Sequence, residues 1–410
     1  MKKKIIISSS IANSKLDGWL DNHAIIIEGG KIKEVISQDD LPNFTSYKII
    51  DFKDSYAIPG LIETHAHLQF SATPEAYEIY FKENDNQKYK RAALNAEKSL
   101  LSGVTSMRDL GAPNDLIFPL KKEIDSGDLK GPTIFPTGTP ITIKDGHCWF
   151  FGSVASNINE IIRIIDNQLS LGATHIKMMA SGGYFTPSSN PRISQYSKEI
   201  IKETVEYCNK NNTYLCAHTL SKTSTVQCIE SGVQNIIHGR WFDESTEKAY
   251  SFKKEYGKMI VDKGLFVDST IAKHLLEYES KLMGEKQRIP NQNVIKSEPT
   301  IKDIIEVFRY LDSIGVKIIG ALDMGMSKAD FNKAVASAWA HVEWLGFDHW
   351  KAIRSLTSTN AEALRIEKIK GFINKGFDAD IVFYKNNPIE NIRNLVFDPM
   401  HVVKNGEIIF

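Results

Sequence analysis

Two histidines separated by one residue follow an apolar run: His65 and His67, in the segment GLIETHAHLQF at residues 60–70. In a β-strand, residues i and i+2 point to the same face, so both imidazole rings would project from one side of the backbone. Two rings placed in this way can chelate a metal ion. The alternative is that both histidines share a polar strand end, so the prediction depends on what else completes a site.

The elements that would position such a site alternate along the chain. From about Leu94, amphipathic helical segments alternate with short β-branched runs, and a glycine such as Gly172 stands where a helix would end. Strands that alternate with helices pair in parallel, and eight such units predict an α/β fold, a closed (β/α)8 TIM barrel. The eight strands are expected near residues 58–64, 104–109, 133–137, 174–179, 214–217, 234–237, 265–268 and 317–322.

The two ends of the chain have a different pattern. Residues 1–57 and 361–410 contain alternating apolar runs with the turn sequences Gly-Gly and Asn-Gly, which are typical of hairpins. We therefore expect both ends to build one small β-sandwich domain. The metal-dependent hydrolase barrel would occupy residues 58–360 as one continuous insertion.

Composition and charge exclude several classes of function. The 50 basic and 50 acidic residues balance, so no net field favours nucleic acid or an anionic membrane. No segment approaches the ~18 apolar residues of a membrane span, and the first apolar run is too short for a secretory signal. The four cysteines form no Cys-x-x-Cys pair and are expected to be buried and reduced. We expect a cytoplasmic homo-oligomer with a small-molecule substrate and no nucleic-acid or membrane partner.

Further residues that could bind metal stand at the ends of the predicted strands. Each has an ordinary alternative, as a core histidine, a lysine with its charge in solvent, or a helix N-cap aspartate. In a barrel, however, the carboxyl ends of all strands face the same mouth. The residues are His65 and His67 after the first strand, Lys177 near the end of the fourth, His218 after the fifth, His238 after the sixth, and Asp323 after the eighth.

These side chains suit divalent cations. Imidazole nitrogen and carboxylate oxygen bind Zn²⁺ and related ions, and a catalytic site keeps one position open for water. Four histidines and one aspartate exceed the needs of one such ion, which predicts two, with zinc as the expected metal. An ammonium cannot bind metal, but addition of CO2 to Lys177 would give an anionic carbamate able to bridge two ions.

The ordered set of motifs resembles the amidohydrolase superfamily in its binuclear form with a carboxylated lysine. PGLIETHAH, SGVTSMRDLG, GATHIKMMASGG, AHT, IIHG and GFINKGFDADIVFYKNNPIENI are similar, over nearly the whole chain, to motifs of the imidazolonepropionase-like branch, which includes Xaa-Pro dipeptidases and carboxypeptidases. The resemblance implies one ion held by His65, His67 and Asp323. It implies a second ion held by His218 and His238, with carboxylated Lys177 as the bridge.

The chain also departs from that branch. IIHG and ALDMG stand where the branch commonly has EHG and GTDAG, and AHTLS stands where it commonly has AHAHG. The ligand positions are kept, whereas the neighbouring residues that shape the pocket differ. The substrate of a relative therefore cannot be transferred from the motifs alone.

The implied site predicts hydrolysis of an amide. A metal-bridging hydroxide would attack the carbonyl, and Asp323 would carry the proton to the leaving amine. His147, in IKDGHCWFFG, would hydrogen-bond the carbonyl or its oxyanion as a catalytic and substrate-binding residue. Tyr184 would line the pocket, and Arg240 would bind a substrate carboxylate. The alternatives are an exposed loop histidine, a packing tyrosine, and an arginine paired with acidic neighbours, Asp243 or Glu244.

The leading prediction is hydrolysis of a C–N bond in a small substrate such as an N-acyl amino acid or a dipeptide. The alternatives on the same site are a cyclic amide of the imidazolone type, a lactone or an organophosphate ester. An inactive binding protein fits least, because all six ligand positions are kept.

The charged segment 271–299 is expected to form a mobile lid. Structural or surface positions are assigned to His175, His274, His341 and His349.

Overall fold

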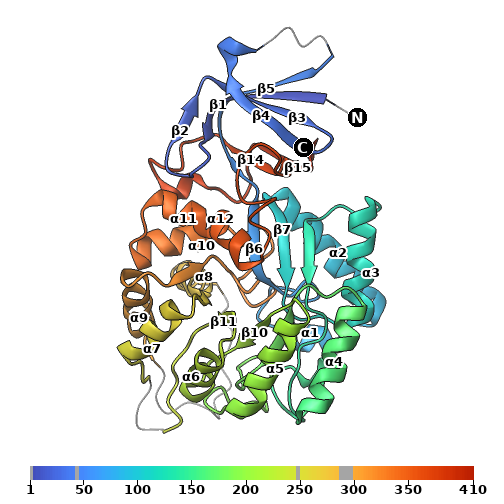
Figure 1. Ribbon diagram of the computed structural model, residues 1–410, viewed down its shortest axis with the longest axis vertical. Coiled ribbons are helices and arrows are strands. Elements are labelled where there is room, and N and C mark those ends of the chain that lie inside the picture. The colour runs from blue at the N-terminus through green and yellow to red at the C-terminus, as the bar shows by residue number, and fades with distance from the viewer. Residues whose placement is uncertain (1–2, 42–45, 246–249, 286–298) are drawn as a thin grey trace.

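The computed structural model describes residues 3–41, 46–245, 250–285 and 299–410. It contains a sheet built from both ends of the chain and two parallel sheets accompanied by helices (Figure 1). Both chain ends lie at the same end of the molecule, beside the first of these sheets. The predicted α/β class is confirmed.

The first sheet has eight strands in the order β16-β15-β14-β5-β1-β3-β4, and β2 pairs with β1. Antiparallel pairing of β14 with β5, with Ile381 opposite Pro59, joins the two ends of the chain. The bounds are β1 (Lys3–Ala12), β2 (Trp19–Asp21), β3 (His23–Glu28), β4 (Lys31–Ser37), β5 (Lys48–Pro59), β14 (Ile381–Tyr384), β15 (His401–Lys404) and β16 (Glu407–Ile408).

The junction between this sheet and the next strand lies at Gly60. Ile58 and Pro59, expected in the first barrel strand, instead pair with β14 as the end of β5. A Cβ at Gly60 would lie 2.2 Å from the hydroxyl oxygen of Thr105, so only glycine fits this close approach. The following strand begins at Leu61.

The remaining strands form two parallel sheets that are joined at both edges. The smaller has the order β6-β7-β8 and the larger β13-β12-β11-β10-β9. Parallel bridges between Ile141 and Met178, and between Ala66 and Met324, link them. The bounds are β6 (Leu61–Ala66), β7 (Val104–Asp109), β8 (Thr133–Pro136), β9 (Ile176–Met179), β10 (Leu215–His218), β11 (Asn235–Ile237), β12 (Phe266–Asp268) and β13 (Lys317–Ile319).

Helices separate most of these strands in sequence, as the amphipathic pattern predicts. In α4, Ile161, Ile165 and Gln168 form a buried stripe, and Gly172 beyond its end has the left-handed φ of 99°. The bounds are α1 (Ala76–Lys82), α2 (Asp85–Leu101), α3 (Asn114–Ser126), α4 (Ile158–Ser170), α5 (Lys198–Lys210), α6 (Lys222–Ser231), α7 (Lys254–Asp262), α8 (Ile271–Leu282), α9 (Ile301–Ser313), α10 (Ala336–Ala340), α11 (His349–Leu356) and α12 (Ser358–Ala363), with short helical turns at Gln38–Asp40, Trp149–Phe151, His341–Leu345 and Ile392–Asn394.

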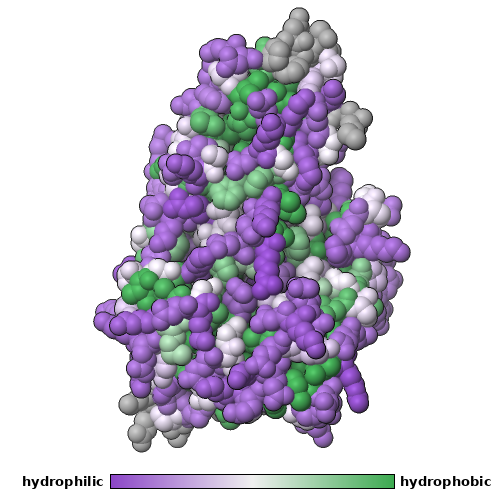
Figure 2. Space-filling view, in the orientation of Figure 1, coloured by the Kyte–Doolittle hydropathy of each residue, from purple (hydrophilic) through white to green (hydrophobic). Residues whose placement is uncertain are grey.

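The outer surface is mainly hydrophilic in the view of Figure 2, with scattered hydrophobic areas. Among the described helices, none combines the length and the hydropathy needed to cross a membrane. All four cysteines are buried and free, as expected.

Candidate metal centre

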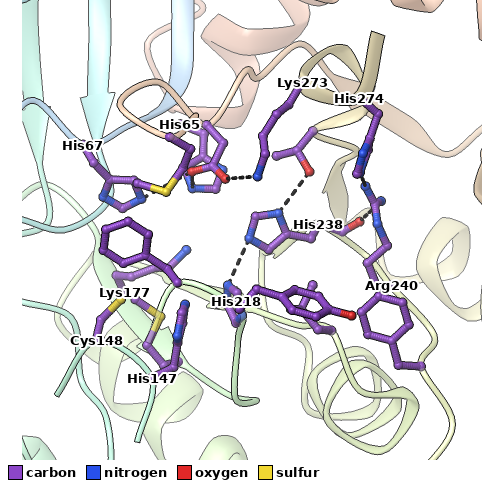
Figure 3. Close-up of a pocket in the computed structure, with 18 of the residues that line it drawn as sticks. His65, His67, His147, Cys148, Lys177, His218, His238, Arg240, Lys273 and His274 are labelled. Carbon is purple, nitrogen blue, oxygen red and sulfur yellow. Dashed lines mark hydrogen bonds and ion pairs between the residues drawn. The ribbon is translucent and has the colours of Figure 1, made fainter. Parts of the chain in front are cut away.

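The six predicted ligand residues line one pocket, which has a volume of about 190 Å³ (Figure 3). They reach it from five different strands or the residues that follow them, because the parallel strands present their carboxyl ends on the same side. Each of these side chains is buried, with at most 9 % of the residue exposed. The residues are His65, His67, Lys177, His218, His238 and Asp323.

The donor atoms of these residues fall into two contacting groups. In the first, Oδ1 of Asp323 lies 3.2 Å from Nε2 of His65 and 3.6 Å from Nε2 of His67. In the second, Nε2 of His238 lies 3.0 Å from Nδ1 of His218. Ligands of one tetrahedral ion at about 2.0–2.1 Å are about 3.3 Å apart, so these separations suit metal binding. His65, His238 and Asp323 also offer donor atoms that all lie within 4.8 Å of one another.

Each of the four histidines has one ring nitrogen among the contacting donor atoms. Its second ring nitrogen makes a hydrogen bond that holds the ring in place. An N–H that donates outward fixes the tautomer and turns the lone pair of the opposite nitrogen inward, as a metal ligand requires. Burial lowers the pKa of His65, His218 and His238 well below its usual range, which favours the neutral ring. The bonds are His65 Nδ1 to Asp268 Oδ2 (2.7 Å), His67 Nδ1 to the Gly111 carbonyl (3.0 Å), His218 Nε2 to the Gly182 carbonyl (3.1 Å) and His238 Nδ1 to Thr270 Oγ1 (3.0 Å).

Two of the predicted ligand residues have a backbone that is uncommon for their type. His238 and Asp323 have φ values of 65° and 62°, in the left-handed region. The carbonyl of His238 accepts a hydrogen bond from Nη1 of Arg240 at 2.7 Å, and that of Asp323 accepts one from the Met326 N–H at 3.2 Å. Such conformations gather at functional sites, where surrounding contacts hold them.

Lys177 is buried within the short strand β9, with 2 % of the residue exposed. Burial penalises the ammonium and lowers the pKa of Lys177 to about 8. The neutral amine is the nucleophilic form of lysine. The side chain is therefore chemically suited to react with CO2.

His147 lies inside the pocket and is 5 % exposed, so the alternative of an exposed loop histidine is wrong. Its ring centroid lies 4.6 Å from that of His218. Its backbone N–H donates to Oε1 of Gln195 at 2.7 Å. A Cβ at Gly183 would lie 2.5 Å from the His147 ring, so the second glycine of the Ser-Gly-Gly motif leaves room for this histidine.

Tyr184 and Arg240 also line the pocket. Tyr184 is half-buried, and its ring centroid lies 6.0 Å from that of Phe242. Arg240 is 3 % exposed, and besides the His238 carbonyl its guanidinium contacts Nε2 of His274 at 3.4 Å. Within the described residues Arg240 forms no ion pair, and the carboxylate of Asp243 lies near Lys222 instead, at 3.7 Å.

The structure adds residues that the sequence reasoning did not identify. Asp268 holds His65, Thr270 holds His238, and Lys273 lies near Asp323. Asp268 ends the predicted seventh strand, so the strand-end rule would have found it. His274, assigned to structure or surface, lines the pocket. The segment 271–299, expected to form a lid, begins as helix α8. Residues 286–298 of this segment lie outside the part of the chain that the structure describes.

The rest of the pocket wall is largely apolar. Aromatic rings and sulfur-containing side chains line the pocket beside the six predicted ligand residues, a common lining for small-molecule sites. The apolar residues include Phe70, Met179, Phe185, Leu220, Phe242 and Met326.

Known proteins share both the sequence pattern and the fold. The model of the amidohydrolase family matches residues 56–409. Ochratoxinase of Aspergillus niger is 23% identical over 423 residues, which cover 95% of this chain and 83% of the relative. Imidazolonepropionase of Picrophilus torridus is 24% identical over 417 residues, which cover 96% and 94%. The crystal structure of a Xaa-Pro dipeptidase with methionine bound in its active site has a TM-score of 0.86 at 24% identity, covering 99% of both chains.

Proposed function

Since the chain belongs to the amidohydrolase family and is a hydrolase of carbon–nitrogen bonds, we propose that it cleaves the amide bond of a small N-acyl amino acid or dipeptide with two divalent metal ions. The resemblance predicted from the motifs is confirmed for the superfamily and for its branch. The observation that carries the proposal is the group of four histidines whose inner nitrogens face Asp323 and one another.

The two contacting groups support the assignment of two ions. One ion would be held by His65, His67 and Asp323, and the other by His218 and His238. Lys177 would bridge them after its neutral amine adds to CO2, which forms an N–C bond, releases one proton and leaves a carbamate. Zinc is the proposed metal, because imidazole and carboxylate donors suit it. Such ions supply an activated water and polarise the scissile carbonyl.

The chain's own residues would move the proton and orient the substrate. Oδ1 of Asp323 faces the histidines, whereas Oδ2 faces Lys273, so the second oxygen can take a proton and return it to the leaving amine. His147, beside His218, would donate a hydrogen bond to the carbonyl or its oxyanion. Tyr184 and Arg240 would contact the substrate from the pocket wall, and Arg240, together with Lys273, would supply positive charge that attracts its carboxylate.

The fold proposal is a closed (β/α)8 barrel over residues 58–360, with a β-sandwich from residues 1–57 and 361–410. It is supported by the two bridges that join the parallel sheets at both edges and by the shared sheet of the chain ends. A barrel would explain why ligands from five different strand ends meet in one pocket.

A screen of substrates tests the proposed function. Zinc-reconstituted protein should release amine from N-acyl amino acids or dipeptides, while an Asp323→Asn preparation made in parallel controls for contaminating hydrolases. A cyclic amide is the second candidate, because the imidazolonepropionase relative matches along nearly the whole chain. Turnover of cyclic amides or esters alone would refute the proposal.

A further inference from the structure

Lys273, in the first turn of α8, lies near Asp323, the proposed proton carrier. Nζ of Lys273 lies 3.8 Å from Oδ2 of Asp323, and its side chain is 24% exposed (Figure 3). The start of this helix is fixed, because Oδ1 of Asp268 accepts the Thr270 N–H at 2.9 Å. The same aspartate holds His65 through its other oxygen. Lys273 is therefore tied in position to the metal-binding residues.

The position of Lys273 matches the geometry of an amino-acid leaving group. In an α-amino acid the carboxylate carbon lies about 2.5 Å from the nitrogen, given bonds of about 1.46 and 1.52 Å. A nitrogen that receives its proton from Oδ2 of Asp323 would lie about 3 Å from that oxygen. When the substrate is turned so that its carboxylate is on the side of Lys273, that carboxylate comes within hydrogen-bond reach of the ammonium, which lies 3.8 Å from the same oxygen.

We infer that Lys273 is a specificity-determining residue that binds the α-carboxylate of the leaving amino acid, so that the preferred substrates are amides with an unblocked α-amino acid on the amine side. This inference rests on the proposed function, in which Asp323 delivers the proton. Binding by Lys273 also gives the substrate carboxylate a partner other than the metal ions. Without such a partner, the carboxylate would compete with the activated water for a place on the metal.

The neighbouring cationic groups are less suited to this contact. Arg240 donates to the His238 carbonyl, and its guanidinium carbon lies 5.6 Å from the ring centroid of Phe308. Nδ1 of His274 lies 3.2 Å from a carboxylate oxygen of Glu277. The ion pair of Lys273 within the described residues is the one with Asp323, at 3.8 Å, longer than a close hydrogen bond. Its flexible stem and three N–H donors can hold Asp323 and a substrate carboxylate together.

Paired substrates test this inference. We would compare kcat/KM for N-acetyl-L-phenylalanine, N-acetyl-L-leucine and N-acetyl-L-methionine, and for their dipeptide analogues, with kcat/KM for the matching C-terminal N-methylamides. Apolar side chains are chosen because Phe70, Phe185 and Met326 line the pocket. Release of the acyl group is measured, so cleavage of the N-methylamide itself does not interfere.

Lys273→Met should lower kcat/KM for the free acids by about 10- to 100-fold, the effect of losing a hydrogen bond to a charged group. The N-methylamides should lose several-fold less than the free acids, since they lack the carboxylate and respond only to the loss of the contact between Lys273 and Asp323. Lys281→Met, on the exposed end of the same helix, is the matched control and should behave as wild type. Lys273→Arg should keep the preference for free acids, and free L-phenylalanine should inhibit Lys273→Met less than wild type.

The possible outcomes separate this inference from the proposed function. Equal losses on acids and N-methylamides, with the metal content unchanged, would mean that Lys273 only supports Asp323, and would overturn the inference. Unchanged acid turnover in Lys273→Met would overturn it as well. Both outcomes leave the proposed function intact. If wild type cleaves none of the acids or dipeptides, the proposed function fails and this inference fails with it.

Discussion

His65 and Asp268 form a buried hydrogen bond, in which Nδ1 of the imidazole lies 2.7 Å from Oδ2 of the carboxylate. Both oxygens of Asp268 act as acceptors, because Oδ1 takes the Thr270 N–H at 2.9 Å. The residue therefore orients His65, a proposed metal ligand, and the start of α8 together. A carboxylate is required for this, since only it offers two acceptors at these positions.

Asp268→Asn should weaken metal binding while preserving the shape of the side chain. The amide has one acceptor oxygen, so either His65 or Thr270 faces an NH2 group and loses its bond. We expect zinc affinity to fall by about 10- to 100-fold, the usual effect of removing a partner of a metal-bound histidine. Competition with a chromophoric chelator measures this. Asp262→Asn, at the exposed end of α7, is the control, and equal affinities in all three proteins would contradict the prediction.

Lys177→Ala should reduce the metal content and abolish turnover. Protein prepared without chelator should contain close to two divalent ions per chain, because the donor groups form two clusters. Removal of the bridging side chain should lower that number, as measured by elemental analysis. Lys210→Ala, at the exposed end of α5, should retain the wild-type value. An alanine variant of Lys177 with both ions and full activity would exclude the bridge.

Asp323→Asn should separate metal binding from proton transfer. The amide oxygen can still face His65 and His67, so most of the metal should remain. The variant lacks the carboxylate that carries the proton, and turnover should fall by roughly 10²–10⁴. Metal content and kcat measured on the same preparation give both quantities. Activity near that of wild type would show that another group transfers the proton.

The meeting of the six proposed ligand residues in one pocket could be predicted because their sequence signals are local. Each lies within or just after a predicted strand, and the positions of seven predicted strands agree with β7–β13 to within a few residues. The predicted first strand begins too early, because Ile58 and Pro59 pair with β14, more than 300 residues away in sequence. A pairing over such a distance leaves no periodic pattern near Gly60.

The pocket residues on α8 could not be predicted in the same way. Lys273 and His274 lie in a charged helical segment, and only the position of the helix over the strand ends turns them toward Asp323 and Arg240. The contacts of Arg240 illustrate the same limit. An ion pair with an acidic neighbour in sequence is the alternative to a substrate contact for this residue, whereas its guanidinium bonds to a backbone carbonyl.

His341 should make the stability of the protein depend on pH. The residue is 1 % exposed, Nδ1 lies 2.9 Å from Oγ of Ser355, and burial lowers the pKa of His341 to about 3. Between about pH 6.5 and pH 3 the unfolded chain binds a proton at this histidine that the folded chain does not, so stability falls as the pH falls.

A non-titrating substitution isolates this contribution. Between pH 7 and pH 5, the free energy of unfolding of wild type should fall by about 2 kcal/mol more than that of His341→Gln, at about 1.36 kcal/mol per unit below the unfolded pKa. Urea unfolding at both pH values measures the difference. The same pH dependence in both proteins would show that His341 does not titrate in this window.

Arg240→Met should cause two separable losses. The guanidinium supports the carbonyl of His238, a proposed metal ligand with a left-handed backbone, so its removal should lower kcat/KM for all substrates. If Arg240 also attracts the substrate carboxylate, free acids should lose a further 1.5–3 kcal/mol or so, the range for a hydrogen bond to a charged group. The matching N-methylamides should show only the first loss. Equal losses for acids and N-methylamides would mean that Arg240 only supports His238. Lys273 would then be the cation that binds the substrate carboxylate.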